Sequence, residues 1–145
     1  MTHHPPVPPE RTAGAARRTG SAVIALALVV AVLSTGAALL VGGTLGAIAL
    51  TTGITGSGMA VLTGLTLRNA GGSIPHPAVD PARARTVRRV LVALFVATAL
   101  CYAGFLVAAF ALGVTAVTLA LMLLEAIPTV LAGVAAVTGH QILRA

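Results

Sequence analysis

The sequence has little charge and very few aromatic side chains. Charged residues make up 8% of the 145 residues and aromatic residues 3%, and neither tryptophan nor lysine occurs. An average soluble domain is roughly one quarter charged, because it must cover its surface with polar groups. With 57% hydrophobic residues and a mean hydropathy of +1.02, the chain is instead predicted to be an integral membrane protein.

Cysteine and acidic residues are also scarce. The single cysteine, Cys101, cannot form an internal disulfide, and its apolar neighbours favour a small buried side chain over a redox or nucleophilic role. Asp and Glu number three against nine arginines, which gives a net charge of +6 and a pI near 11.7. Because the arginines flank apolar segments, this charge predicts contact with anionic lipid headgroups and not with nucleic acid.

Four apolar segments are long enough to cross a membrane, which takes about 20 residues. The predicted spans are residues 21–41, 44–67, 90–112 and 114–137. Gly42-Gly43 and Gly113 mark tight turns within two helical hairpins, and a loop at 68–89 joins the hairpins. The sequence therefore predicts an all-α bundle of four transmembrane helices in residues 21–145, after a disordered tail in residues 1–20.

The arginines predict the orientation of the bundle. All nine lie before the first span, in the 68–89 loop or at the C-terminus, and neither turn contains one. Cationic loops stay on the cytoplasmic side, so we expect both termini and the loop to be cytoplasmic in the plasma membrane. The loop arginines expected to contact lipid headgroups are Arg83, Arg85, Arg88 and Arg89.

Small residues recur at steps of three and four along the spans. In lipid, helices associate through close backbone approach at such residues, so each stripe predicts a packing face. In the third span the stripe comprises Ala93, Ala97, Cys101, Gly104, Ala108 and Ala111. The principal packing residues predicted over the whole chain are Gly46, Gly53, Ser57, Gly64, Gly104 and Gly133.

One acidic residue, Glu125, falls about halfway along the fourth span. A charged carboxylate at such a position costs roughly 2.5–3.5 kcal/mol on insertion scales, so we expect the side chain to face the bundle interior. Pro128 leaves the carbonyl of Leu124 without its helical donor, and Thr129 adds a hydroxyl. These groups form a candidate proton, small-cation or water site. The alternative is a neutral carboxyl whose hydrogen bond only fixes helix packing.

The two halves of the chain share a short similarity. Residues 58–64, GMAVLTG, and residues 133–139, GVAAVTG, have four identities in seven positions. A duplicated hairpin would produce this match. Chance similarity in a chain rich in Ala, Gly, Val and Thr would produce it as well, and both explanations stay open.

In its arrangement of four spans, the chain resembles small four-helix membrane proteins of unknown function from high-GC actinobacterial genomes. This resemblance is architectural and implies only the fold. The chain is also similar to small multidrug-resistance transporters in size and in having one membrane acid. There the acid lies on the first helix among aromatic residues, whereas Glu125 lies on the fourth, so their function is not carried over.

Two functions are compatible with these features. The first is a non-enzymatic scaffold or accessory subunit, whose partners are the lipid bilayer and either a second copy or another membrane protein. The second is a small proton- or cation-linked transporter or channel that uses Glu125. An enzyme is not expected, because one intramembrane acid supplies little chemistry, and no cofactor or metal site is predicted.

Overall fold

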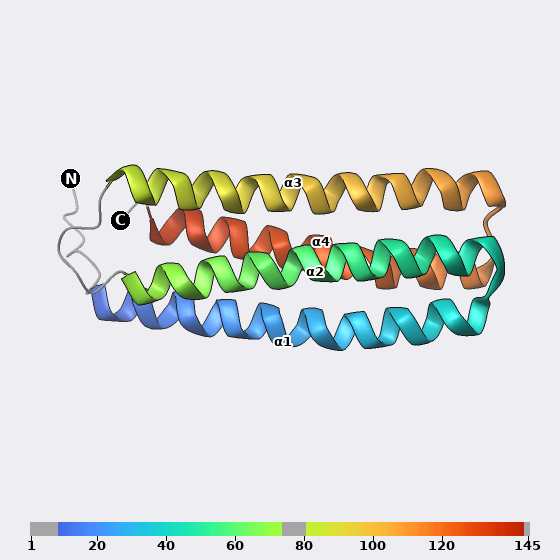
Figure 1. The fold of residues 1–145 in the computed structure, drawn as a ribbon, viewed down its shortest axis with the longest axis horizontal. Helices are drawn as coiled ribbons and strands as arrows, with labels where there is room; N and C mark the ends of the chain where they lie inside the picture. The colour runs from blue at the N-terminus through green and yellow to red at the C-terminus, as the bar shows by residue number, and fades with distance from the viewer. Residues whose placement is uncertain (1–8, 74–80, 144–145) are drawn as a thin grey trace, which may run out of the picture.

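The computed structural model describes residues 9–73 and 81–143, and the side chains of 13–71 and 81–143. Its helices are α1 (Pro9–Val41), α2 (Gly43–Ser73), α3 (Pro81–Leu112) and α4 (Ala116–Ile142) (Figure 1). All four helices are long and apolar enough to cross a membrane. The prediction of an all-α chain with four membrane-length helices is confirmed.

The helices extend beyond the predicted spans. Helix α1 begins at Pro9, so the prediction of a disordered tail is wrong for residues 9–20. The prediction of a loop is wrong for residues 68–73, which belong to α2, and for residues 81–89, which belong to α3. The remaining parts of the predicted tail and loop, 1–8 and 74–80, lie outside the described residues.

The extensions have a simple physical origin. Hydropathy marks where the apolar stretch ends, but alanine and arginine are strong helix formers and extend α1 and α3 past that point. At the start of α1 the extension is also packed: Ala13 and Ala16 are buried. A Cβ on Gly71 of α2 would lie 3.0 Å from the carbonyl oxygen of Ala13, so the two helices are in close contact there.

Glycines in the left-handed region connect the helices. Gly42 and Gly43, at φ +63° and +60°, turn the chain from α1 into α2, and Gly113 follows α3 at φ +103°. These values favour glycine, which has no Cβ. Helix α4 begins at Ala116, two residues later than predicted, because the Thr115 hydroxyl accepts a hydrogen bond from the Thr118 amide at 3.2 Å and caps the helix.

The two hairpins, α1–α2 and α3–α4, lie side by side with their turns at the same end (Figure 1). Helices α2 and α4 contact each other and both remaining helices. Within the described residues α1 and α3 do not contact each other. Helices α2 and α4 therefore form the centre of the bundle, which is where a side chain on either of them is best shielded from lipid.

The bundle interior has an apolar, polar, apolar order along its length. One buried apolar cluster, at the end away from the turns, includes Ala27, Ala60, Leu91 and Leu131, one from each helix. A second, nearer the turns, includes Ala38, Ala49, Phe105 and Leu121. On each helix a buried polar residue falls between its members of the two clusters. These residues, which we call the middle layer, are Ser34, Ser57, Thr98 and Glu125.

Candidate functional site

The carboxyl of Glu125 lies in the middle layer of the bundle. Its side chain is only 2% exposed, so it points into the interior and away from lipid. The Ser34 hydroxyl of α1, itself buried, donates a hydrogen bond to Glu125 Oε1 on α4. This bond links two helices from different hairpins at the level where the apolar clusters are interrupted.

Gly53 of α2 packs against the Ser34–Glu125 pair, so a third helix borders this site. A Cβ at position 53 would collide with the Ser34 hydroxyl and would lie 3.0 Å from Glu125 Oε1. Any side chain other than hydrogen would therefore displace one of the two hydrogen-bonding partners. The space that this glycine leaves open is what allows a serine and a glutamate from neighbouring helices to meet.

Three buried oxygen atoms near the middle of the bundle have no hydrogen-bond partner within the described residues. They are Ser57 Oγ, Glu125 Oε2 and Thr129 Oγ1. A buried polar group without a partner costs about 1–3 kcal/mol, and ordered water commonly removes that cost. The second carboxyl oxygen of Glu125 thus keeps a free capacity to accept a hydrogen bond or, when protonated, to donate one.

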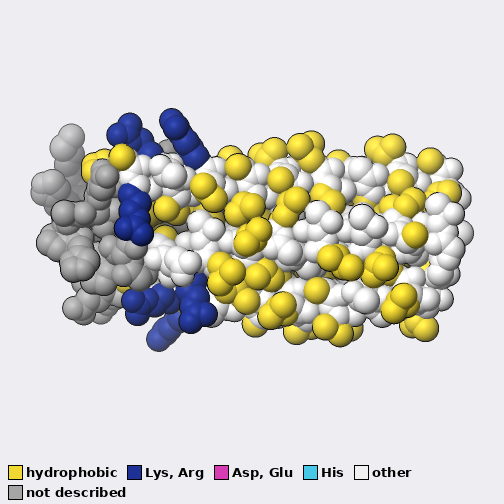
Figure 2. Space-filling view, viewed as in Figure 1, with side chains coloured by type: hydrophobic (Ala, Val, Ile, Leu, Met, Phe, Trp, Pro, Cys, Tyr) yellow, Lys and Arg dark blue, Asp and Glu magenta, His cyan; other side chains and the backbone are white. Residues whose placement is uncertain are grey.

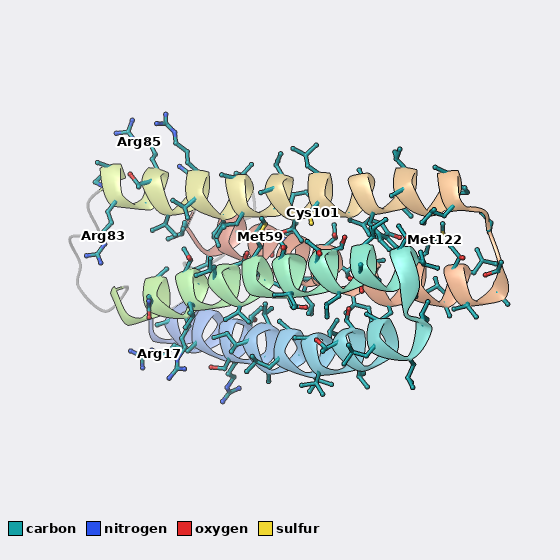
Figure 3. All side chains as sticks on the ribbon, turned by 45° about the vertical axis from the view of Figure 1, so that its right-hand side comes forward. Arg17, Met59, Arg83, Arg85, Cys101 and Met122 are labelled. Carbon is teal, nitrogen blue, oxygen red and sulfur yellow. The ribbon has the colours of Figure 1, made fainter. Side chains whose placement is uncertain are left out.

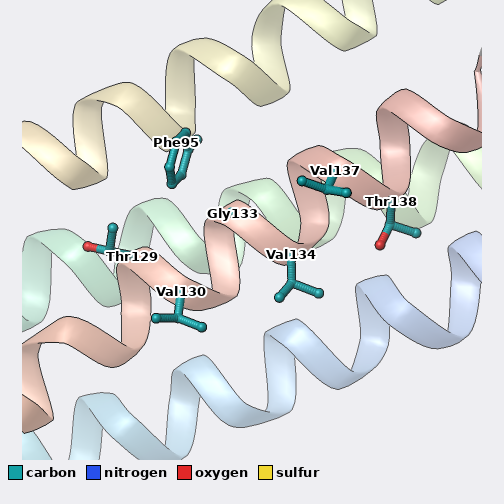
Figure 4. Close-up of a pocket in the computed structure, with 7 residues that line it drawn as sticks. All are labelled: Phe95, Thr129, Val130, Gly133, Val134, Val137 and Thr138. Atoms are coloured by element: carbon teal, nitrogen blue, oxygen red, sulfur yellow. The ribbon is translucent and has the colours of Figure 1, made fainter.

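The other two residues of the predicted proton or ion site do not join the carboxyl in a hydrogen-bonded group. Pro128 is buried and packs against α2, with its Cβ 3.5 Å from the position of a Cβ on Gly56. Thr129 lines a groove of about 520 Å³ between α4 and Phe95 of α3. Figure 4 shows Phe95 pointing from α3 towards Gly133 of α4, with Thr129 beside it. Thr129 therefore lies at the α3 side of α4, while the carboxyl is bonded to α1.

Helix α3 is tied to α4 next to the site. The Tyr102 hydroxyl donates a hydrogen bond of 2.9 Å to the carbonyl oxygen of Met122, which precedes Glu125 by three residues. The Tyr102 ring stacks on buried Phe105, with the ring centroids 6.5 Å apart. Cys101 is half-buried and makes no disulfide. Each of the other three helices thus contacts α4 within one turn of Glu125.

The predicted packing glycines of α2 lie in its contact with α1. A Cβ on Gly46 would lie 2.5 Å from the carbonyl oxygen of Ala38, and one on Gly64 would lie 2.8 Å from the carbonyl oxygen of Gly20. On α4, a Cβ on Gly133 would lie 3.1 Å from the Phe95 ring. Ser57 is buried on the same helix as Gly46 and Gly64.

The packing face predicted for α3 is wrong at Gly104. Gly104 is exposed, and a Cβ there would meet no atom within 4 Å. The residues that α3 buries are Leu91, Thr98, Phe105 and Ala109. Large side chains of α3 fill notches that α4 provides: Leu91 occupies the space over Gly139, as Phe95 does over Gly133. Close packing needs small residues on only one of two facing helices, so the small stripe of α3 was a misleading signal.

The arginine side chains gather at one end of the bundle, opposite the turns (Figure 2). Figure 3 shows Arg17 of α1 at the same end as Arg83 and Arg85 of α3. The four arginines predicted to contact headgroups, Arg83, Arg85, Arg88 and Arg89, all lie in the first part of α3 and not in a loop. This clustering agrees with a single charged face at one membrane surface.

Sequence reasoning missed Ser34 as the partner of Glu125. Nothing in the local sequence distinguishes Ser34 from the other small residues of the first span. A weak signal exists in the pattern itself. In each helix at least one buried hydroxyl or carboxyl falls between the members of the two apolar clusters.

Comparison of the chain with protein-family models, curated proteins and solved structures finds no match. The class of protein therefore rests on the fold and the site alone. Four apolar helices of membrane length indicate a multi-pass membrane protein. Among its described residues, no three His, Cys, Asp or Glu side chains gather closely enough to hold a metal ion.

Proposed function

We propose that this chain is a non-enzymatic scaffold or accessory subunit of the plasma membrane, with both termini cytoplasmic. The observation that carries the proposal is the buried hydrogen bond between Ser34 and Glu125. The acid is 2% exposed and is covered by α1 and by Gly53 of α2. A carboxyl used in this way stabilises the bundle, and the lipid-facing surfaces stay available for other membrane components.

The orientation is supported by the position of the arginines. Those with described side chains, including Arg17, Arg68 and Arg85, lie at the end of the bundle away from the turns. Cationic ends of membrane helices favour the cytoplasmic side, where anionic lipids attract them. The partners proposed for the chain are this anionic bilayer surface and a second copy or another membrane protein.

A second function is favoured by one specific observation. Glu125 Oε2 and Ser57 Oγ are buried without partners, so the middle layer has unused capacity for water or a proton. A proton- or cation-linked transporter would need such capacity at the centre of the membrane. In this alternative the carboxyl takes up and releases a proton as the bundle opens towards one side and then the other.

Proton flux in liposomes, measured with the wild type and Glu125→Gln, separates the two functions. The amide keeps an oxygen that accepts from Ser34, but it does not ionise and so cannot carry a proton at neutral pH. For a scaffold we expect no flux above that of empty liposomes in either protein, and a folded bundle in both. Flux in the wild type that disappears in a folded Glu125→Gln variant would overturn the scaffold proposal and establish the transporter.

A further inference from the structure

The outer face of α3 carries a groove of about 730 Å³ near the arginine-rich end of the bundle. Its polar rim consists of three arginines of α3, Arg85, Arg88 and Arg89, together with His140 from the last turn of α4. Its floor is apolar and includes Val92, Val96 and Leu100. Arg83, which the sequence grouped with the other arginines, does not line this groove.

In the described part of the chain, no acidic side chain neutralises the positive charge of the rim. The acidic side chain described there is that of Glu125, which is buried in the middle layer. The rim also lies close to the amino-terminal end of α3, which carries the positive end of the helix dipole. Three arginines at such a place create a strong attraction for an anion.

The floor extends from this charged rim along the helix towards the middle layer. Val92, Val96 and Leu100 are 49%, 47% and 68% exposed and follow one another at steps of four residues. At 1.5 Å per residue, this apolar floor is about 12 Å long. A free phosphate ion would leave the floor uncovered. A molecule with an anionic head and a hydrocarbon tail would cover the charged rim with its head and the apolar floor with its tail.

A second copy of the chain fits this face poorly. Two copies inserted in the same direction and paired through the outer face of α3 would bring Arg85, Arg88 and Arg89 of one against the same residues of the other. Like charges brought together at an interface cost several kcal/mol. An acidic lipid of the surrounding bilayer would neutralise the rim instead.

We propose that this groove is a binding site for one acidic glycerophospholipid. The phosphate is held between the three arginines and His140, and the first part of an acyl chain lies along Val92, Val96 and Leu100. The site differs from general attraction of the arginine-rich end to the bilayer, because it uses a defined set of side chains from two helices and an apolar floor.

Native mass spectrometry of the full chain with dioleoyl phosphatidylglycerol or dioleoyl phosphatidylcholine tests the proposal. We expect the wild type to retain one phosphatidylglycerol molecule in preference to phosphatidylcholine. Replacing Arg88 and Arg89 together by Gln should weaken that retention on the order of thirtyfold, since each arginine near a lipid surface contributes roughly fivefold. The matched control is Arg17→Gln with Arg18→Gln, which removes the same charge from exposed positions of α1 outside the groove.

Equal losses in the two double variants would overturn the proposal, because they would show only general attraction between charges. The floor is tested separately with Val96→Trp, which fills the groove, and Val107→Trp, an exposed position of α3 beyond it. We expect Val96→Trp to reduce retention and Val107→Trp to leave it unchanged. Retention that is unaffected by Val96→Trp, or a dimer in place of a lipid adduct, would contradict the site as described.

Discussion

The Ser34 hydroxyl donates a hydrogen bond to the Glu125 carboxyl across 91 positions of sequence, joining the first helix to the last. Both side chains are buried, and both lie between the two apolar clusters of the bundle. Van der Waals packing alone allows two membrane helices to pair in many registers, whereas a given hydrogen bond forms in only one of them. This pair therefore specifies how the α1–α2 hairpin aligns with α4.

Removing the hydroxyl should weaken the bundle by a modest amount. We expect Ser34→Ala to lower the free energy of unfolding by about 0.6–1.7 kcal/mol, because hydrogen bonds between membrane helices contribute about 0.6 kcal/mol on average and about 1.7 kcal/mol at most. A double-mutant cycle with Glu125→Leu, followed by unfolding in mixed micelles, isolates the pairwise contribution. If the two substitutions have strictly additive effects, the hydrogen bond does not contribute to stability.

Substitution of Gly53 should be more damaging than removal of the bond that it accommodates. We expect Gly53→Ala to cost about 1–3 kcal/mol, because the new Cβ collides with the Ser34 hydroxyl and crowds Glu125 Oε1. The control is Gly58→Ala on the same helix, where a Cβ meets nothing within 4 Å. Thermal unfolding of both variants should show a loss for the first and none for the second, and equal losses would contradict the close contact.

The Tyr102 hydroxyl should matter for the attachment of α3. Tyr102→Phe keeps the stacked ring against Phe105 and removes only the hydrogen bond to the Met122 carbonyl. We expect a loss of about 0.5–1.5 kcal/mol in the free energy of unfolding. Phe110→Leu serves as the comparison, because Phe110 is exposed on the same helix. A Tyr102→Phe protein as stable as the wild type would show that the bond does not hold α3.

The orientation can be tested by cysteine labelling in intact cells. In a Cys101→Ser background, we expect a cysteine at position 44, beside the Gly42-Gly43 turn, to react with a membrane-impermeant maleimide added from outside. A cysteine at position 73, the last residue of α2, should react only after the cells are opened. External labelling at position 73 would show that the arginine-rich end is not cytoplasmic.

The sequence by itself determined the number of helices, their approximate bounds and the glycine turns. Apolar length and the absence of side chains at Gly42, Gly43 and Gly113 are local properties, and local properties are enough to define such elements. It also determined that Glu125 avoids lipid, because an acid in hydrocarbon is costly whatever the tertiary structure is. The helix ends beyond the apolar stretches were not determined in this way, since hydropathy does not mark where a helix stops.

Only the tertiary structure decided which residues meet. Ser34 became the partner of Glu125 because Gly53 leaves room between α1, α2 and α4, and that depends on the relative register of three helices. Gly104 was predicted to pack because small residues permit close approach, but α4 supplies the notches and α3 fills them with Leu91 and Phe95. A small side chain permits a contact without requiring one. The choice among permitted contacts is made by the shape of the facing helix, which no single segment of sequence contains.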